Sequence, residues 1–250
     1  MPWDFALLLA LLSIAVPLHT AREIRTLLRV HALSAVERRA TYLLTIAFQW
    51  VATVLVIWRV EARGVTRAAL GIALPEPGRA FAAAFVLTSG LVAYQLWSLA
   101  QMSLLPREKQ GVEGELARKL MPQSRREWPV FAALTVTVAL CEEFIFRGFA
   151  YAAIQIVIEN PWAAMLGSSV LFSLAHAYQG ARGMRTTFLV GLIFAAAREW
   201  SGSLAPVVLA HFATDFVVGV LAPQRLAATR SEAATAPATS AGDESKNDCS

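Results

Sequence analysis

Three charged side chains interrupt a long apolar run near the middle of the chain. They lie in CEEFIFRG, residues 141–148, between the apolar stretches FAALTVTVAL and FAYAAIQIVI. Glu143 and Arg147 are four residues apart with the acid first, the order in which two helical side chains meet best, so we expect a buried ion pair. Glu142 points about 100° away from Glu143 on a helix and needs a different neighbour. An unpaired carboxyl group in such a run is a candidate general acid or base. The alternative is that both acids form one structural cluster with Arg147.

Two histidines lie in apolar segments that follow this one. His176 belongs to FSLAHAYQG, with Phe172 one turn earlier, and His211 belongs to HFATD, with Asp215 one turn later. A single histidine in a helix is more often a packing residue than a catalyst. An acid and two histidines on three apolar segments, in a chain that otherwise keeps charge out of such segments, predict one shared cavity. Counted along the expected helices, His176 lies shallower than the other two.

The composition is that of a membrane protein. The chain has 250 residues, of which 56% are hydrophobic and only 16% charged, and its mean hydropathy is +0.52. Soluble domains have about 25% charged residues. The calculated pI of 9.4 would suggest nucleic acid in a soluble protein, but here the arginines stand between apolar runs, where topology and lipid headgroups explain them. We therefore expect no nucleic-acid partner. Cys141 and Cys249 are not expected to form a disulfide.

The apolar segments predict an all-α bundle of about seven transmembrane helices. They are residues 3–19, 41–58, 81–105, 128 to the Asn160-Pro161 break, 162–178, 186–197 and 203–221. The first is interpreted as a retained span rather than a signal sequence, because Asp4 precedes it and no clear cleavage site follows. The arginine-rich stretch 20–40 is either an interfacial amphipathic helix or a basic loop.

Three regions follow from this pattern. Residues 1–127 form N-terminal spans with basic loops, residues 128–221 form a core that contains the chemistry, and residues 222–250 form a tail. The tail contains Ala, Thr, Ser, Pro and charged residues with few large apolar side chains, so we expect it to be disordered.

The basic residues predict an orientation in the membrane. With the N-terminus outside, sixteen Lys and Arg residues fall on the inner side and five on the outer side, while Arg147 lies within the membrane. This bias favours a cytoplasmic tail.

The three motifs together resemble the CPBP intramembrane protease family, which includes the CAAX prenyl endopeptidases and the bacterial Abi proteins. The pattern E-E-x-x-x-R, F-x-x-x-H and H-x-x-x-N/D is present over residues 128–221. The resemblance implies that Glu142 and His176 activate a water molecule and that His211 and Asp215 stabilise the oxyanion. It assigns supporting roles to Glu143, Arg147 and Phe172.

Asp215 departs from the family pattern, in which asparagine is frequent. An ionised aspartate would repel an oxyanion, so either Asp215 is protonated or, as we favour, it orients His211. Zinc is the alternative to metal-free glutamate chemistry, with Glu142, His176, His211 and Asp215 as ligands. We favour the metal-free reading because the chain lacks an H-E-x-x-H motif.

The resemblance predicts an intramembrane endopeptidase that cleaves a membrane-associated protein or peptide, of CAAX type if the family name applies. Its location would be a plasma membrane, with bacterial origin compatible with the Ala- and Arg-rich composition. A non-enzymatic scaffold or bacteriocin-immunity protein is the first alternative. A proton-coupled transporter is the second, because intramembrane Glu and His are also relay residues.

Overall fold

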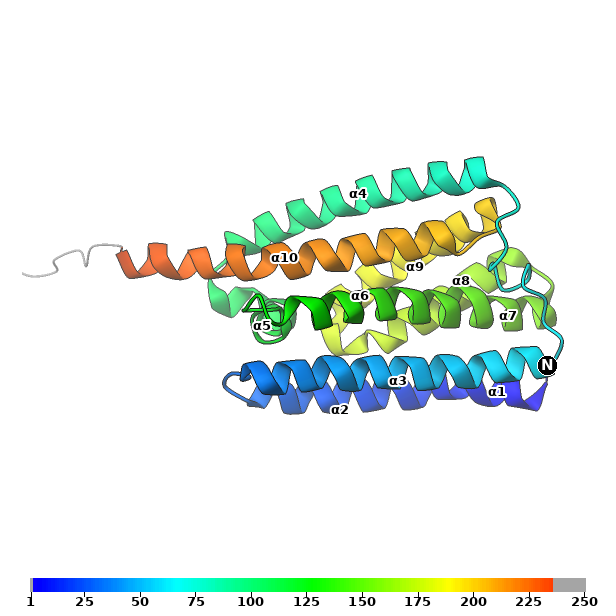
Figure 1. Ribbon diagram of the computed structural model, residues 1–250, viewed down its shortest axis with the longest axis horizontal. Helices are drawn as coiled ribbons and strands as arrows, with labels where there is room; N and C mark the ends of the chain where they lie inside the picture. Colours follow the sequence, from blue (N-terminus) through cyan, green and yellow to red (C-terminus); the bar gives the residue numbers. More distant parts are fainter. Residues whose placement is uncertain (1, 236–250) are drawn as a thin grey trace, which may run out of the picture.

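The computed structural model describes residues 2–235 and the side chains of residues 2–225. Within this part of the chain every regular element is a helix (Figure 1). The elements are α1 (Trp3–Ala10), η1 (Leu11–Ala15), α2 (Val16–Arg29), α3 (Ala35–Ala62), α4 (Pro77–Ser103), η2 (Arg107–Lys109), α5 (Gly111–Leu120), α6 (Trp128–Glu143), η3 (Phe144–Ala150), α7 (Tyr151–Ile158), α8 (Pro161–Ala175), η4 (Ala177–Gln179), α9 (Gly180–Ser201) and α10 (Ala205–Thr235). The all-α prediction is confirmed.

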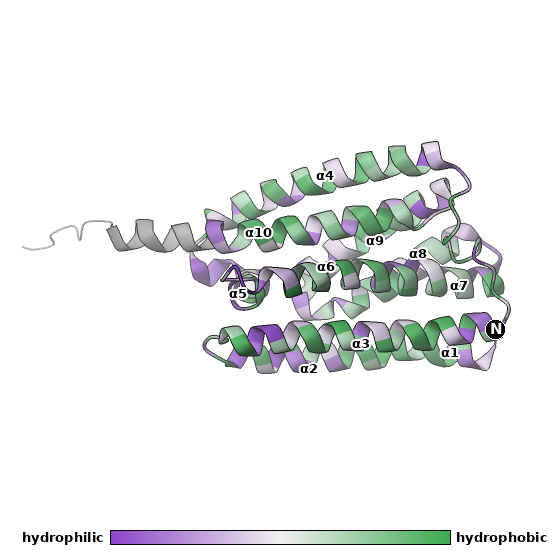
Figure 2. Cartoon of the chain, in the orientation of Figure 1, coloured by the Kyte–Doolittle hydropathy of each residue, from purple (hydrophilic) through white to green (hydrophobic). Residues whose placement is uncertain are grey.

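Five helical segments of the described chain are long and apolar enough to cross a membrane. They are Trp3–Arg29, Ala35–Ala62, Pro77–Ser103, Trp128–Ile158 and Ala205–Arg225. The other two predicted spans fall in α8, a shorter apolar helix, and in α9. Hydrophobic residues predominate along α3, α4 and α6, whereas hydrophilic residues gather around α5 at one end of the bundle (Figure 2). The N-terminus lies at the opposite end of the bundle from the end of α10 (Figure 1).

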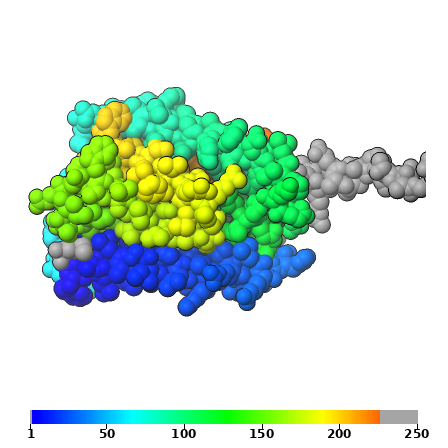
Figure 3. Space-filling model, turned by 180° about the vertical axis from the view of Figure 1, so that it is seen from behind, coloured from blue at the N-terminus to red at the C-terminus, as the bar shows by residue number. Residues whose placement is uncertain are grey.

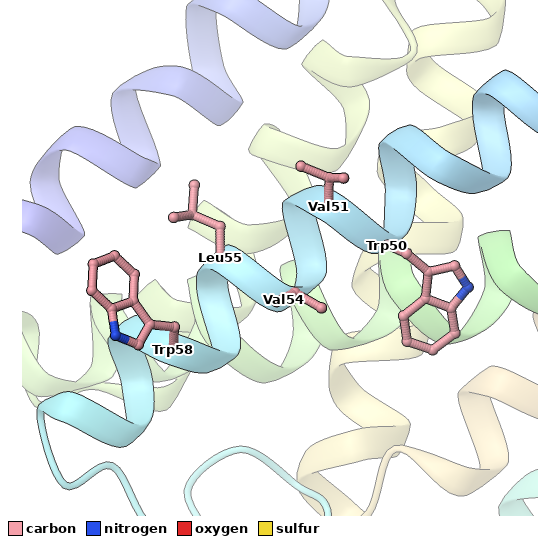
Figure 4. A pocket seen from close by; sticks show the side chains of 5 residues that line it. All are labelled: Trp50, Val51, Val54, Leu55 and Trp58. Atoms are coloured by element: carbon pink, nitrogen blue, oxygen red, sulfur yellow. The ribbon is translucent and has the colours of Figure 1, made fainter.

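Helix α3 has two distinct faces. Its outer face carries large exposed apolar side chains, which form the shallow hollow in Figure 4: Trp50, Val51, Val54, Leu55 and Trp58. Its inner face buries Tyr42, Thr53, Val56 and Val60 at helical spacing. An apolar stripe of this kind on a span is what lipid solvates, so α3 turns one face to lipid and the other to α6.

The arginine-rich stretch 20–40 contains the end of one helix, a short connection and the start of the next helix. Helix α2 continues the first span without a break to Arg29, and α3 begins at Ala35 behind a capping box formed by Ser34 and Glu37. The π-helical turn η1 ends two residues before Pro17, whose ring would clash with the carbonyl one turn earlier in a regular helix. The first span can therefore continue past this proline.

The connections around α9 are shorter than expected. Residues 181–185 and Arg198–Ser201, interpreted from sequence as connecting segments, are both helical. Single glycines make the turns at each end, since Gly180 and Gly202 have φ values of +76° and +66° and glycine adopts this left-handed region without steric cost.

Helix α10 passes the expected tail boundary at residue 222 and continues to Thr235. The residues just beyond the boundary are rich in alanine, the strongest helix former, which accounts for the continuation past Pro223. The rest of the predicted tail, residues 236–250, lies outside the described residues.

The segment between α3 and α4 closes one end of the bundle. Leu70 is only 4% exposed, and the backbone N–H of Leu204 donates to the carbonyl of Gly71 at 2.7 Å. A Cβ atom on Gly148 would lie 3.1 Å from the Leu70 carbonyl oxygen. At the glycine that follows Arg147, a backbone segment thus passes close to the central helix, the continuous segment Trp128–Ile158 formed by α6, η3 and α7.

The main hydrophobic core surrounds η3, all seven residues of which are buried. The helices packed around this segment contribute Phe5, Val56, Phe172, Phe194 and Val207. On the face seen in Figure 3, the first span runs along α8 and the start of α9. The charged part of the central helix therefore lies inside the bundle and is covered by both N-terminal and C-terminal helices.

Candidate active site

Of the two adjacent acids Glu142 and Glu143, Glu143 is fully buried, with 0% exposure. Its Oε1 atom accepts a hydrogen bond from Arg147 Nη1 at 3.1 Å and lies 2.8 Å from His211 Nδ1. The first contact is the expected i, i+4 pair, which persists although Arg147 stands in the π-helical segment. The second contact was not foreseen. One carboxylate oxygen therefore joins the central helix to α10.

Arg147 is also fully buried and is held between aromatic rings. Its guanidinium carbon lies 4.0 Å from the ring centroid of Phe172 and 5.4 Å from that of Phe194. Contacts with ring faces stabilise a desolvated cation, which matters because Nε and Nη2 have no hydrogen-bond partner among the described residues. A Cβ atom on Gly191 would lie 3.2 Å from Nη2, so a glycine on α9 makes room for the guanidinium.

His211 lies between two carboxylates. Its Nδ1 contacts Glu143, and its Nε2 lies 3.5 Å from Asp215 Oδ2, one turn further along α10. The His211 side chain is 11% exposed and that of Asp215 is 39% exposed. A ring protonated on both nitrogens can donate to both acids, although the Asp215 contact is long for a hydrogen bond.

Glu142 has a partner that the sequence did not reveal. Gln49 of α3 donates from Nε2 to Glu142 Oε1 at 2.9 Å. The other oxygen, Oε2, is buried and has no hydrogen-bond partner among the described residues. A neutral amide from a neighbouring helix thus bonds one of the two carboxylate oxygens. Glu142 forms no ion pair within residues 2–225.

His176 follows the last residue of α8 and is the C-cap of that helix, in agreement with its shallower expected position. Its Nδ1 lies 2.9 Å from the backbone carbonyl oxygen of Phe172. A carbonyl oxygen only accepts, so Nδ1 carries the proton and, in the neutral ring, Nε2 is left as a base.

The ring of Phe172 brings the separate parts of the site together. Its centroid lies 4.5 Å from that of His176 and 6.3 Å from that of His211, and Arg147 covers it as described above. Two histidines 35 positions apart in the sequence thus pack against one buried side chain. The phenylalanine four residues before His176 acts as the wall that they share.

Tyr178 packs beside His176 at this end of the site. It belongs to η4, the short element that follows α8, and its ring centroid lies 5.9 Å from that of His176.

The described side chains do not fit the zinc alternative as they lie. Within residues 2–225 no group of three His, Cys, Asp or Glu side chains is arranged as metal ligands. Both nitrogens of His211 face carboxylates, and Nδ1 of His176 faces a carbonyl.

Sequence reasoning missed Gln49 and Gly191. Gln49 is a lone amide in an otherwise apolar span, and such a residue needs a partner within the bilayer, which is the signal that would have found it. Gly191 has no comparable signal, since its role depends on how close α9 lies to Arg147.

The comparison with known families gives a match over the segment that contains the site. Residues 124–217 match the family model described as Rce1-like, type II CAAX prenyl endopeptidase. The matched segment contains the acidic pair, Arg147, both histidines and Asp215 but excludes α1 to α5. No curated protein and no solved structure matches the chain. Residues 124–217, somewhat more than a third of the chain, are thus similar to the Rce1-like type II CAAX prenyl endopeptidases.

Proposed function

We propose that the protein hydrolyses a peptide bond with a water molecule activated by Glu142 and His176. The pair takes a proton from the water as its oxygen attacks the carbonyl carbon of the substrate. The C–N bond then breaks, and the proton passes to the leaving amine. Water is thus divided into the hydroxyl of the new carboxyl group and a hydrogen of the new amine, with no further reactant.

The observation that carries this proposal is the state of Glu142 Oε2, which is buried and lacks a hydrogen-bond partner among the described residues. Oε2 of Glu143 lacks a partner too, but Glu143 is already paired with Arg147, so Glu142 is the acid left for a water molecule. Buried carboxylate oxygens are nearly always hydrogen-bonded, and an unbonded one needs an explanation. An acceptor reserved for a reacting water explains it. His176 supports the same assignment, because its Nδ1 contact leaves Nε2 as the basic nitrogen.

His211 is proposed to stabilise the oxyanion that forms during the attack. A protonated imidazole supplies a donor and a positive charge, which are most valuable where negative charge develops in a site that excludes water. Glu143 and Asp215 flank this ring. We assign to both acids the role of orienting His211, in line with the reading of Asp215 as an orienting acceptor.

The proposed substrate is a membrane-associated protein or peptide with a prenylated CAAX end. The class follows from the description of the matching family. The many exposed apolar side chains on α3 and α4 support a site within a lipid-embedded bundle, which suits a substrate anchored in the same bilayer.

The test uses the full chain in proteoliposomes and a farnesylated CAAX peptide with a fluorophore and a quencher on either side of the scissile bond. We expect the wild type to cleave the peptide. Glu142→Gln and His176→Ala should each lower kcat by about 10²- to 10⁴-fold while the protein accumulates normally in the membrane. Mass analysis of the products gives the cleavage site.

Other outcomes favour the alternatives. If both variants cleave as fast as the wild type, the assignment of the water-activating pair is wrong. An intact peptide with the wild type, together with a cellular phenotype that survives Glu142→Gln, indicates a scaffold or immunity protein. Proton flux driven by a pH gradient, lost in Glu142→Gln, indicates a transporter.

We also propose that the α5 end of the bundle faces the cytoplasm of a bacterial plasma membrane. The excess of Lys and Arg in the connections and tail at this end supports the orientation. A reporter fused after residue 250 should be active only as a cytoplasmic fusion. Activity of a periplasmic reporter at that position would reverse the proposed topology.

A further inference from the structure

We propose that Gln49 of α3 is a positioning residue for Glu142, so that the catalytic site is completed by a helix outside the family match. This inference rests on the proposed role of Glu142 as the base that activates water. It gives a function to the N-terminal spans, for which the sequence alone offered none.

The contact is specific and crosses a large sequence distance. Gln49 and Glu142 are 93 positions apart, and the amide Nε2 donates to Oε1 at 2.9 Å. Gln49 is half-buried and lies seven residues after Tyr42 and four before Thr53, on the stripe of α3 that packs against α6. The next residue, Trp50, belongs to the outward hollow of Figure 4. The amide of Gln49 therefore lies on the inward-facing stripe of α3.

The register of α3 against the central helix is fixed from one end. Arg38 forms a buried ion pair with Glu127 at 2.7 Å, and the hydroxyl of Tyr42 donates to the carbonyl of Leu120. These contacts hold the start of α3 against the start of α6. They set the position at which Gln49 meets Glu142, and the position does not depend on the Gln49 contact itself.

The chemistry of the donor suits a base. The two adjacent acids receive different partners, since Glu143 is paired with the cation Arg147, whereas Glu142 receives a neutral amide. An amide restrains the carboxylate without adding positive charge, so the acid remains able to accept a proton. Because Oε1 is occupied, rotation about the terminal bond is restricted and Oε2 is the oxygen left for water.

A structural role alone is the competing explanation, because amides also join membrane helices. The two roles differ in what a substitution changes. A residue that only joins helices affects the amount or stability of the protein. A residue that holds the base in a productive geometry affects kcat with little change in KM, since small misplacements of a catalytic group cost up to about 10²-fold in rate.

The experiment compares Gln49→Leu and Gln49→Asn with Gln101→Leu in the farnesylated-peptide assay. Leucine is well tolerated in a membrane span, and asparagine keeps the amide but shortens its reach by one methylene group. Gln101 is an exposed amide on α4 and serves as the control. We expect both Gln49 variants to lower kcat by about 10- to 100-fold with KM and thermal stability in detergent near wild-type values, and Gln101→Leu to match the wild type.

A double variant separates this inference from the proposed function. In a Glu142→Gln background, Gln49→Leu should cause no further loss of rate, because its effect passes through the acid. Wild-type kcat in both Gln49 variants, or a loss that follows thermal stability, overturns the inference and leaves the proposed function intact when Glu142→Gln is inactive. An active Glu142→Gln, or an intact peptide with the wild type, overturns both.

Discussion

Nδ1 of His211 lies 2.8 Å from Oε1 of Glu143, the same oxygen that accepts from Arg147. The acid that the local sequence pairs with an arginine is therefore also the acid that contacts a histidine of α10. Its neighbour Glu142 lies against α3 instead. Two adjacent carboxylates thus face different sides of the central helix, as expected for side chains about 100° apart around the helix axis.

Loss of the Glu143 carboxylate should lower the thermal stability of the protein. Glu143→Ala leaves Arg147 as an uncompensated charge at 0% exposure, which costs about 3–5 kcal/mol. We expect a clear fall in Tm in detergent and loss of peptide cleavage. The double variant Glu143→Leu/Arg147→Leu should recover part of the stability, because it removes both buried charges, but none of the activity. A Glu143→Ala protein as stable as the wild type would contradict the importance of this pair.

The Asp215→Asn substitution should lower kcat less than replacement of His211 does. Its Oδ2 lies 3.5 Å from His211 Nε2 and its side chain is 39% exposed, so Asp215→Asn keeps a polar group of the same shape beside the ring. We expect this variant to retain most of the wild-type kcat, whereas His211→Ala loses about 10²- to 10³-fold. Asp215→Leu should be intermediate. Equal losses in Asp215→Asn and His211→Ala would mean that the carboxylate itself takes part in the reaction.

The Arg38–Glu127 pair should make the stability of the fold depend on pH in the acidic range. Burial alone would raise the pKa of Glu127, but hydrogen bonds from Arg38, the Gln123 backbone and Ser124 outweigh it and hold the pKa below its usual 4.5. A lowered pKa in the folded state stabilises the fold above pH 4.5, and this contribution is lost as the pH falls through the folded-state value.

Thermal unfolding of wild type and Glu127→Gln as a function of pH tests this sign. The wild type should be the more stable protein near neutral pH, and the difference should shrink at pH values below 4.5, where the carboxylate becomes protonated. A constant difference across the acidic range would show that the hydrogen bonds, rather than the charge, account for the stabilisation.

Gly148 should not accept a side chain. A Cβ atom there would lie 3.1 Å from the Leu70 carbonyl oxygen, whereas one on Gly90 of α4 would have no neighbour within 4 Å. Gly148→Ala must displace the segment that closes this end of the bundle, at a cost of about 1–3 kcal/mol. We expect a lower Tm for Gly148→Ala and an unchanged or higher Tm for Gly90→Ala, since alanine favours a helix interior. Equal Tm values for the two variants would disprove the close contact.

The sequence alone predicted the features that depend on local geometry. The all-α class follows from the apolar runs, and the Glu143–Arg147 contact follows from helical spacing. The break at Asn160-Pro161 is also local, since the Asn160 side chain accepts from the first backbone N–H groups of α8. Errors occurred where local signals are weak, at the ends of α9, because glycine and charged residues are compatible with both loops and helix ends.

Only the tertiary structure decided which acid serves which partner. Helical spacing puts Glu142 and Glu143 on different faces, but the neighbour of each face depends on the rotation and register of α3 and α10 against the central helix. Contacts far apart in the sequence, such as Arg38 with Glu127 and Leu204 with Gly71, set that packing. The partnership of Gln49 with Glu142 and the shared Phe172 wall are therefore consequences of helix packing, a nonlocal property that no spacing along one segment encodes.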